Sequence, residues 1–134
     1  ILRLPIVYGE DNLKGVIPSM LSSYFTSKTI KVFNEGRSIR DFLYIDDFLN
    51  AFLKVINYGK GGVFNVSSEA TYSMIDIARI ITNNPEEIRI FNQNSNKLGK
   101  MSLNYTKAST SLHYNPSFNK ITKEMLLNIY KNCK

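Results

Sequence analysis

Short apolar runs typical of buried strands alternate along this chain with segments in which apolar residues recur every three or four positions. The strand-like runs cover 2–7, 30–33, 39–45, 63–66 and 88–91. The helical spacing covers 16–25, 48–56, 72–81 and 121–130, and 106–112 is a shorter helix candidate. Strands and helices that alternate in this way predict an α/β fold.

The first apolar run also bears on how much of a domain the chain represents. It begins at Ile1, not Met, and residues 2–7 already resemble a buried parallel strand. The chain has 134 residues and is 43% hydrophobic, which is enough for the core of one domain or of part of one. Because a domain rarely begins within its own core, we expect the chain to be a fragment of a larger protein.

Composition excludes several classes of protein. No apolar run approaches the roughly 20 residues of a membrane span, and the first residues lack the layout of a signal peptide. The single cysteine, Cys133, excludes an internal disulfide and a cysteine-based zinc site, and we expect no metal and a cytoplasmic protein. The net charge of +6 is spread along the sequence, so we expect a solvated surface and no nucleic-acid partner.

Groups that could perform catalysis are few. The only histidine, His113, lies near a turn, where a partly buried structural role is the more ordinary interpretation. Asp46 and Asp47 could form a pair of carboxylates, but they precede a helical segment, so we favour Asp46 as its N-cap. No glycine-rich loop with phosphate-binding spacing is present in the sequence.

The pattern Tyr-x-x-x-Lys, which can form an acid–base pair, occurs twice in the sequence. Tyr24 precedes Lys28 at this spacing, and Tyr130 precedes Lys134. Chance alone produces such matches in a chain with eight tyrosines and many lysines, and Tyr24 falls on the apolar side of its predicted helix. We therefore assign neither pair a catalytic role.

Arg40 is the best single candidate for binding a ligand. It lies where a turn at Gly36 leads into the strand-like run. A guanidinium group at such a junction can donate two parallel hydrogen bonds to phosphate oxygens. An ion pair with Asp41 or another carboxylate is the alternative, and spacing alone does not separate the two.

Four ordered segments resemble the extended short-chain dehydrogenase/reductase family, which comprises NAD-dependent nucleotide-sugar epimerases and dehydratases. They are LRLPIVYGE, GRSIRDFLYIDDFLNAF, GGVFNVSSEATYSMIDIARII and LHYNP. They are similar to the family's LR-x-x-NVYG segment, its G-x-x-x-RDF segment, its G-x-YN segment with the helix after it, and its LGW-x-P segment. Ile6 stands where the family has Asn, and His113 and Tyr114 stand where it has Gly and Trp.

The resemblance covers residues 1–134 but corresponds only to the C-terminal part of the family. It implies late strands of a Rossmann-type sheet together with the mixed α/β substrate-binding region. The cofactor loop and the catalytic Tyr-x-x-x-Lys would lie before Ile1, so no catalytic residue is expected in this chain. NAD or NADP would serve the parent enzyme, and we expect neither to bind this chain tightly.

The resemblance also implies ligand-binding residues. Those matching positions near the nicotinamide end of the cofactor are Leu4, Pro5 and Ile6. Those matching the nucleotide-sugar site are Val32 and Phe33 at the base, Arg40 at the diphosphate, and Lys97 in a segment similar to R-x-GD.

The expected function is that of an enzyme fragment on the nucleotide-sugar-binding side. Its partners would be a nucleotide-diphosphate sugar and the missing N-terminal half, and the parent could be a homodimer. A non-catalytic sugar-nucleotide-binding module and an inactive truncated remnant are the alternatives.

Overall fold

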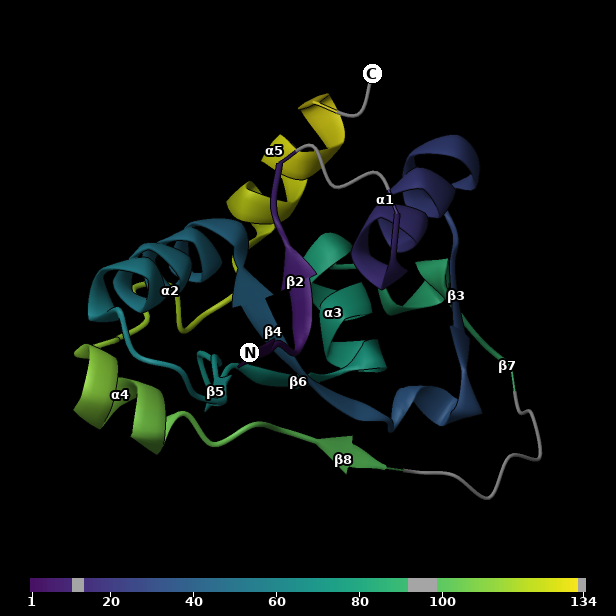
Figure 1. Ribbon diagram of the computed structural model, residues 1–134. Coiled ribbons are helices and arrows are strands. Elements are labelled where there is room, and N and C mark those ends of the chain that lie inside the picture. The colour runs from purple at the N-terminus through teal and green to yellow at the C-terminus, as the bar shows by residue number, and fades with distance from the viewer. Residues whose placement is uncertain (11–13, 92–98, 133–134) are drawn as a thin grey trace. The chain divides into compact units, whose positions relative to one another are not determined.

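The computed structural model describes residues 1–10, 14–91 and 99–132 (Figure 1). The chain folds into two compact units, each assembled from three separate segments. Unit 1 comprises Ile1–Tyr8, Arg40–Thr71 and Met101–Lys120. Unit 2 comprises Gly9–Ile39, Tyr72–Lys100 and Ile121–Lys134. Among the described helices, none is both long enough and apolar enough to cross a membrane.

Unit 1 is built around two small sheets and two helices, and the pairs β1–β5 and β2–β4 are parallel. Its helices are α2 (Ile45–Tyr58) and α4 (Thr106–Leu112). Its strands are β1 (Leu2–Arg3), β2 (Ile6–Tyr8), β4 (Ile39–Tyr44), β5 (Phe64–Asn65), β6 (Thr71–Ser73) and β8 (Lys100–Met101). β1 pairs with β5, and a second sheet has the order β2-β4-β6 with β8 also paired to β4. Strands β4, β6 and β8 each extend by one or two residues into the segments of unit 2.

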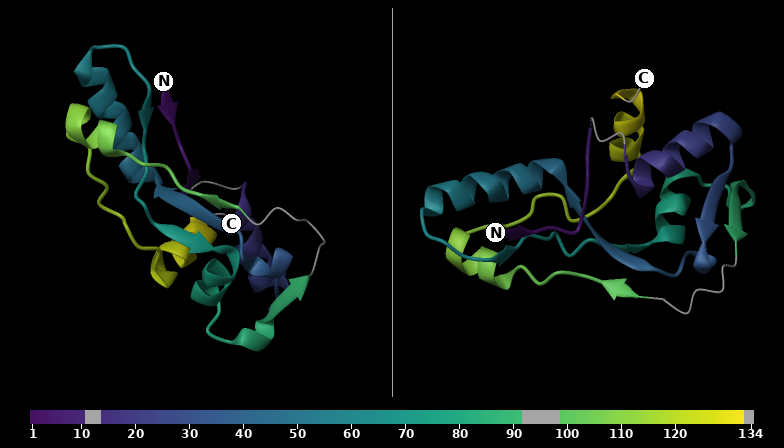
Figure 2. Two further views of the ribbon diagram at one scale, coloured as in Figure 1. Left: turned by 90° about the horizontal axis from the view of Figure 1, so that it is seen from below. Right: turned by 45° about the vertical axis from the view of Figure 1, so that its right-hand side comes forward.

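The core of unit 1 forms where α2 and α4 pack against these strands. Figures 1 and 2 show the two helices side by side. The buried residues of this core are Leu43, Ala51, Phe64, Val66, Ala108, Leu112 and Tyr114. Because they come from all three segments of the unit, the core closes only when residues far apart in the sequence meet.

Unit 2 packs three helices around a two-stranded parallel sheet. The helices are α1 (Val16–Ser27), α3 (Met74–Ile81) and α5 (Lys123–Asn132). The strands are β3 (Ile30–Phe33) and β7 (Ile88–Phe91), with Ile30 opposite Ile88. Short 3₁₀ turns at Asn34–Gly36 and Pro85–Glu87 complete the unit. Fully buried aliphatic side chains, among them Leu21, Ile77 and Leu126, fill its interior.

The α/β fold and most of the expected elements are confirmed, with differences that have local causes. The run at 2–7 forms two short strands separated at Leu4 and Pro5, because proline has no N–H for a ladder hydrogen bond. Ser73 caps α3, and the side chain and backbone of Asp76 complete a capping box. The expectation that Asp46 caps its helix was wrong, since α2 begins at Ile45 after Tyr44.

Candidate functional site

Asp41 fixes the strand that carries Arg40. Its side chain is fully buried, and Oδ2 accepts hydrogen bonds from the Ser67 hydroxyl at 2.5 Å and from the Leu103 N–H at 3.1 Å. Among the described residues, Oδ1 has no hydrogen-bond partner. Asp41 therefore joins β4 to the segment after β5 and to the segment after β8, and its burial is explained without an ion pair to Arg40.

Burial also sets the electrostatics behind β4. Desolvation raises the pKa of Asp41, and the hydrogen bonds from Ser67 and Leu103 oppose that shift only in part. Desolvation likewise raises the pKa of Tyr114, whose hydroxyl donates to the Ser67 carbonyl at 3.3 Å. Ser67 thus links two buried groups whose pKa values are raised, and all three residues lie in unit 1.

Of the residues expected near the cofactor, Ile6 begins the strand next to Arg40, and Leu4 and Pro5 directly precede it. β2 runs parallel to β4, and Ile6 faces Phe42, two residues after Arg40. Leu4 is 37% exposed, whereas Pro5, Ile6 and Arg40 are half-buried. Unit 1 therefore brings the predicted nicotinamide-facing segment and the predicted diphosphate-binding arginine onto adjacent strands.

The residues expected at the nucleotide base lie in unit 2 and differ in exposure. Val32 is buried, whereas Phe33 is 48% exposed. The Phe33 ring lies 5.7 Å from the ring of Phe91, which faces it across the parallel pair β3–β7. Sequence reasoning missed Phe91, although an apolar run at 88–91 parallel to 30–33 would have placed it there. Lys97 lies outside the described residues.

The two neighbouring aspartates have separate roles. Asp46 is exposed, whereas Asp47 is buried and accepts hydrogen bonds from the N–H groups of Ser117 and Phe118 at 2.7 and 2.9 Å. Asp47 therefore anchors the chain segment that follows α4. The two aspartates therefore do not act as a pair of catalytic carboxylates, and Asp46 is not the N-cap of α2.

His113 occupies a turn position and no catalytic cluster. It ends α4 with a φ of 50° and is exposed, so the expectation of partial burial was wrong. Such a left-handed conformation favours glycine, which is the residue the family has there. Within the described ranges, no group of three or more His, Cys, Asp or Glu side chains could hold a metal ion.

The match formed by Tyr24 and Lys28 does not show the geometry of an acid–base pair. The Lys28 ammonium group lies over the ring of Tyr24, 5.0 Å from its centroid. That arrangement is a cation–π contact, in which the lysine approaches the ring face. Lys134 lies outside the described residues.

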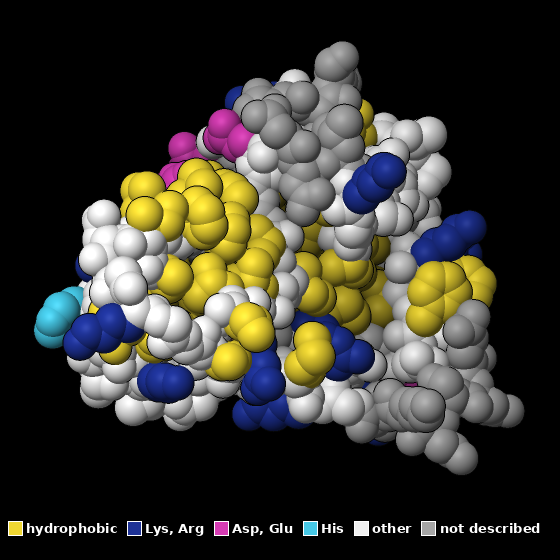
Figure 3. Space-filling model, in the orientation of Figure 1, with side chains coloured by type: hydrophobic (Ala, Val, Ile, Leu, Met, Phe, Trp, Pro, Cys, Tyr) yellow, Lys and Arg dark blue, Asp and Glu magenta, His cyan; other side chains and the backbone are white. Residues whose placement is uncertain are grey.

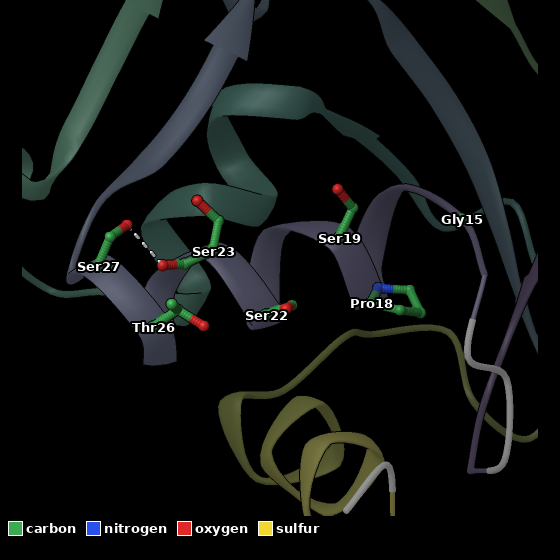
Figure 4. A pocket seen from close by; sticks show the side chains of 7 residues that line it. All are labelled: Gly15, Pro18, Ser19, Ser22, Ser23, Thr26 and Ser27. Atoms are coloured by element: carbon green, nitrogen blue, oxygen red, sulfur yellow. Dashed lines mark hydrogen bonds between the residues drawn. The ribbon is translucent and has the colours of Figure 1, made fainter.

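A shallow depression of about 540 Å³ runs along α1 in unit 2 (Figure 4). It is lined by Gly15, Pro18, Ser19, Ser22, Ser23, Thr26 and Ser27. The Ser27 hydroxyl donates to the Ser23 carbonyl, so part of this polar lining is satisfied within the helix. The lining contains no charged side chain and none of the predicted ligand-binding residues, so we do not assign the depression to the candidate site.

Comparison with known families and curated proteins gives consistent matches. The model of the NAD dependent epimerase/dehydratase family matches residues 1–67. The dTDP-4-dehydro-6-deoxy-D-allose reductase of Streptomyces bikiniensis is 31% identical over 86 residues, which are 61% of this chain and 26% of that protein. The dTDP-D-glucose 4,6-dehydratase of Dictyostelium discoideum is 29% identical over 85 residues, which are 62% of this chain and 20% of that protein. The matches thus span about a quarter of these relatives' length.

Solved structures match over nearly the whole chain. UDP-glucuronic acid 4-epimerase from Bacillus cereus, in complex with UDP-glucuronic acid and NAD, matches 99% of this chain and 44% of its own, with a TM-score of 0.82 and 24% identity. dTDP-glucose 4,6-dehydratase from Bacillus anthracis, in complex with NAD, matches 98% and 44%, with a TM-score of 0.82 and 19% identity. The fold is therefore that of the C-terminal portion of Rossmann-type epimerases and dehydratases, as the resemblance implied.

Proposed function

Because this chain belongs to the NAD dependent epimerase/dehydratase family, we propose that it is the nucleotide-sugar-binding part of such an enzyme. Its relatives are named as reductases and dehydratases of dTDP-linked sugars, and a structural neighbour holds UDP-glucuronic acid. Less than half of each matched structure corresponds to this chain, which supports a role as one part of a larger enzyme.

The observation that carries the proposal is the placement of Arg40 beside a buried anchor. Asp41 holds β4 through Ser67 and Leu103, so the backbone from which Arg40 projects is fixed on two sides. A guanidinium group on a fixed backbone loses less freedom when it forms a fork with a diphosphate. We assign Arg40 to the diphosphate of the nucleotide sugar.

The base of the nucleotide would stack on Phe33. Its ring is about half exposed and lies beside that of Phe91, so an apolar aromatic surface is available in unit 2. Val32 faces the interior, which leaves only its backbone for contact with a ligand. Stacking on an aromatic ring accepts any base, so the diphosphate and the sugar would have to supply specificity.

The residues present fit only one end of the NAD that the family uses. Leu4, Pro5 and Ile6 are apolar and partly exposed, which suits a surface against the nicotinamide ring. The sequence contains no glycine-rich loop to hold the cofactor's diphosphate. NAD supplies hydride-transfer chemistry when bound, and in this proposal the chain contributes only an apolar contact to it.

Titration calorimetry with UDP-glucose and dTDP-glucose tests this function. We expect binding by the folded chain, and Arg40→Ala should weaken it by about 1.5–3 kcal/mol through loss of the phosphate fork. Arg40→Lys keeps the charge without the fork, so its affinity should fall between the two. Arg79→Ala is the matched control, because Arg79 is exposed and ion-paired with Asp76 on α3. A folded sample that binds neither compound would favour the inactive remnant.

A further inference from the structure

The outer face of the β3–β7 pair carries two cations beside two aromatic rings. Along β3, buried and exposed residues alternate, and Lys31 and Phe33 are the exposed ones. In the parallel strand β7, Arg89 stands opposite Lys31 and Phe91 stands opposite Phe33, and both are exposed. Figure 3 shows basic and hydrophobic side chains next to one another at the right of the molecule, where Figure 1 places these strands. We call these four side chains the β3–β7 platform.

The two cations of the platform lie where they repel each other. Neighbouring strands are about 4.8 Å apart, so like charges at paired positions destabilise a sheet. Within the described part of the chain, neither Lys31 nor Arg89 takes part in an ion pair that would offset this repulsion. An anion bound between them would offset it, and a phosphate group has both the charge and the acceptor oxygens for hydrogen bonds from both side chains. The pair therefore indicates a phosphate-binding site.

The two rings of the platform suit a flat ligand. The rings of Phe33 and Phe91 have centroids 5.7 Å apart, are tilted by 34° and are 48% and 41% exposed. Their exposed surface can stack on a nucleobase, because every base has a π-face. Side chains two residues apart on a strand lie roughly 6.6 Å apart on the same face, so the cations lie about the length of a ribose away from the rings. A nucleoside 5′-monophosphate has the same order of groups, namely base, ribose and phosphate.

We propose that the platform binds a free nucleoside 5′-monophosphate, with the base on the two rings and the phosphate between Lys31 and Arg89. The whole platform lies in unit 2, so this binding does not use Arg40 of unit 1. The resemblance to the family assigns no role to Lys31, Arg89 or Phe91. The inference rests on the proposed function in one respect, because the base would occupy the ring of Phe33 that the nucleotide sugar also uses. A free nucleotide therefore competes with the nucleotide sugar.

A single strand of nucleic acid fits the platform less well. β3 and β7 are each four residues long, so their outer face holds one pair of cations and one pair of rings. Proteins that bind single strands follow the backbone over several nucleotides, with successive bases stacked on successive rings. The platform therefore matches one nucleotide.

Titration calorimetry of the full chain at low ionic strength tests this site. The ligands are UMP, uridine and inorganic phosphate, which present base and phosphate together, base alone and phosphate alone. We expect UMP to bind at least tenfold more tightly than either part, and added NaCl to weaken the binding of UMP but not that of uridine. Equal affinities for UMP and uridine would overturn the proposal. A ten-nucleotide oligouridylate that binds at least tenfold more tightly than UMP would also overturn it, since a nucleic-acid strand would then be the ligand.

Two double variants separate the platform cations from a general effect of charge. Lys31→Gln with Arg89→Gln should weaken UMP binding at least tenfold and leave uridine binding unchanged, because only the phosphate contacts are lost. Arg79→Gln with Lys123→Gln is the matched control, since both residues are exposed in unit 2 and the same two charges are removed. Equal weakening in the two double variants would contradict the assignment. The Tm of the platform variant should not fall, because the repulsion between the two cations is removed, and this measurement confirms that the variant is folded.

Competition distinguishes this inference from the proposed function. UMP should displace UDP-glucose from the chain. If UDP-glucose binds, Arg40→Ala weakens it and UMP does not displace it, the proposed function stands and this inference fails. If UMP binds through Lys31 and Arg89 whereas UDP-glucose does not bind, the nucleotide site stands and the proposed function fails.

Discussion

At the scale of single residues, Asp41 makes the stability of this chain depend on pH. Burial raises its pKa, so between the ordinary and the raised value the folded chain holds a proton that the unfolded chain lacks. The free energy of unfolding should therefore fall as pH rises through this interval. Urea unfolding of the chain and of Asp41→Asn at several pH values measures this slope, which the variant should flatten.

The Ser67 hydroxyl supplies the control for this expectation. It donates to the Asp41 carboxylate and lowers its pKa, in opposition to burial. Ser67→Ala should therefore raise the pKa of Asp41 further and move the pH-dependent loss of stability to higher pH. A slope that is the same in the parent chain, Asp41→Asn and Ser67→Ala would show that other groups cause it.

His113 offers a gain in stability by relief of backbone strain. It holds a φ of 50° at the end of α4, a conformation that costs an ordinary residue about 1–2 kcal/mol. His113→Gly removes this cost but loses some entropy on folding, so we expect a net gain of about 0.5–1 kcal/mol. Thermal unfolding would show it as a higher Tm. His113→Ala retains a Cβ and should give no such gain, and an equal gain in both variants would refute the explanation.

Single residues were predictable where a local rule acts and not where distant segments meet. The Ser73–Asp76 capping box joins residues three apart, so a local sequence rule is enough to find it. The partners of Asp41 and Asp47 lie up to 71 residues away, so no local pattern could reveal them. The junction of a turn and a strand made Arg40 a candidate for ligand binding, and the resemblance to the family, not spacing, favoured the diphosphate over an ion pair.

At the scale of elements, the turn after β3 depends on a glycine for two reasons. Gly36 has a φ of +67°, and a Cβ there would lie 2.7 Å from Cβ of Ile75 and 2.8 Å from Cγ1 of Val32. Gly36→Ala should therefore destabilise the chain by about 2–4 kcal/mol, from backbone strain together with overpacking. Urea unfolding measures the change.

Gly59 at the end of α2 is the matched control for Gly36. Its φ of +64° is nearly the same, but a Cβ there would have no neighbour within 4 Å. Gly59→Ala should cost only the backbone strain of about 1–2 kcal/mol. If the two variants lost equal stability, packing against α3 would not contribute at Gly36.

The elements themselves were largely predictable, but the use of their faces was not. Periodicity placed α2 within three residues of its observed start and predicted one apolar face that comprises Phe48, Ala51, Phe52, Val55 and Ile56. The structure buries Ala51 and leaves Phe52 and Ile56 exposed. A sequence shows that a helix is apolar, but which stripe meets the core depends on the other segments that pack there. The short strands β6 and β8, of three and two residues, carry too few residues for any period to be seen.

At the scale of the whole molecule, the two units interleave along the sequence. Each contains one segment from the beginning, one from the middle and one from the end of the described chain. The sequence contains no long linker between them, because composition marks a boundary only where a chain leaves one unit once. Here the chain crosses between units repeatedly, at strands such as β4 and β6, where apolar residues continue without interruption.

The whole chain is expected to bind a nucleotide sugar without converting it. Conversion in this family's chemistry requires a held cofactor and an acid–base pair. Among the described residues, His113 is an exposed helix end, and Lys28 stacks on the ring of Tyr24. Incubating the chain with NAD and UDP-glucose or dTDP-glucose, followed by chromatography of the sugars, should therefore show no product.

This assay needs two controls: evidence that the chain is folded, and an enzyme that converts its substrate under the same conditions. Binding heat with the parent chain, reduced in Arg40→Ala, shows that the sample is folded and that its site is occupied. The Bacillus cereus epimerase, assayed with UDP-glucuronic acid and NAD, confirms that the conditions support turnover. NAD-dependent conversion by the purified chain would contradict the proposal that the chain only binds the nucleotide sugar. It would show that the chain contains an acid–base pair other than Tyr24 and Lys28.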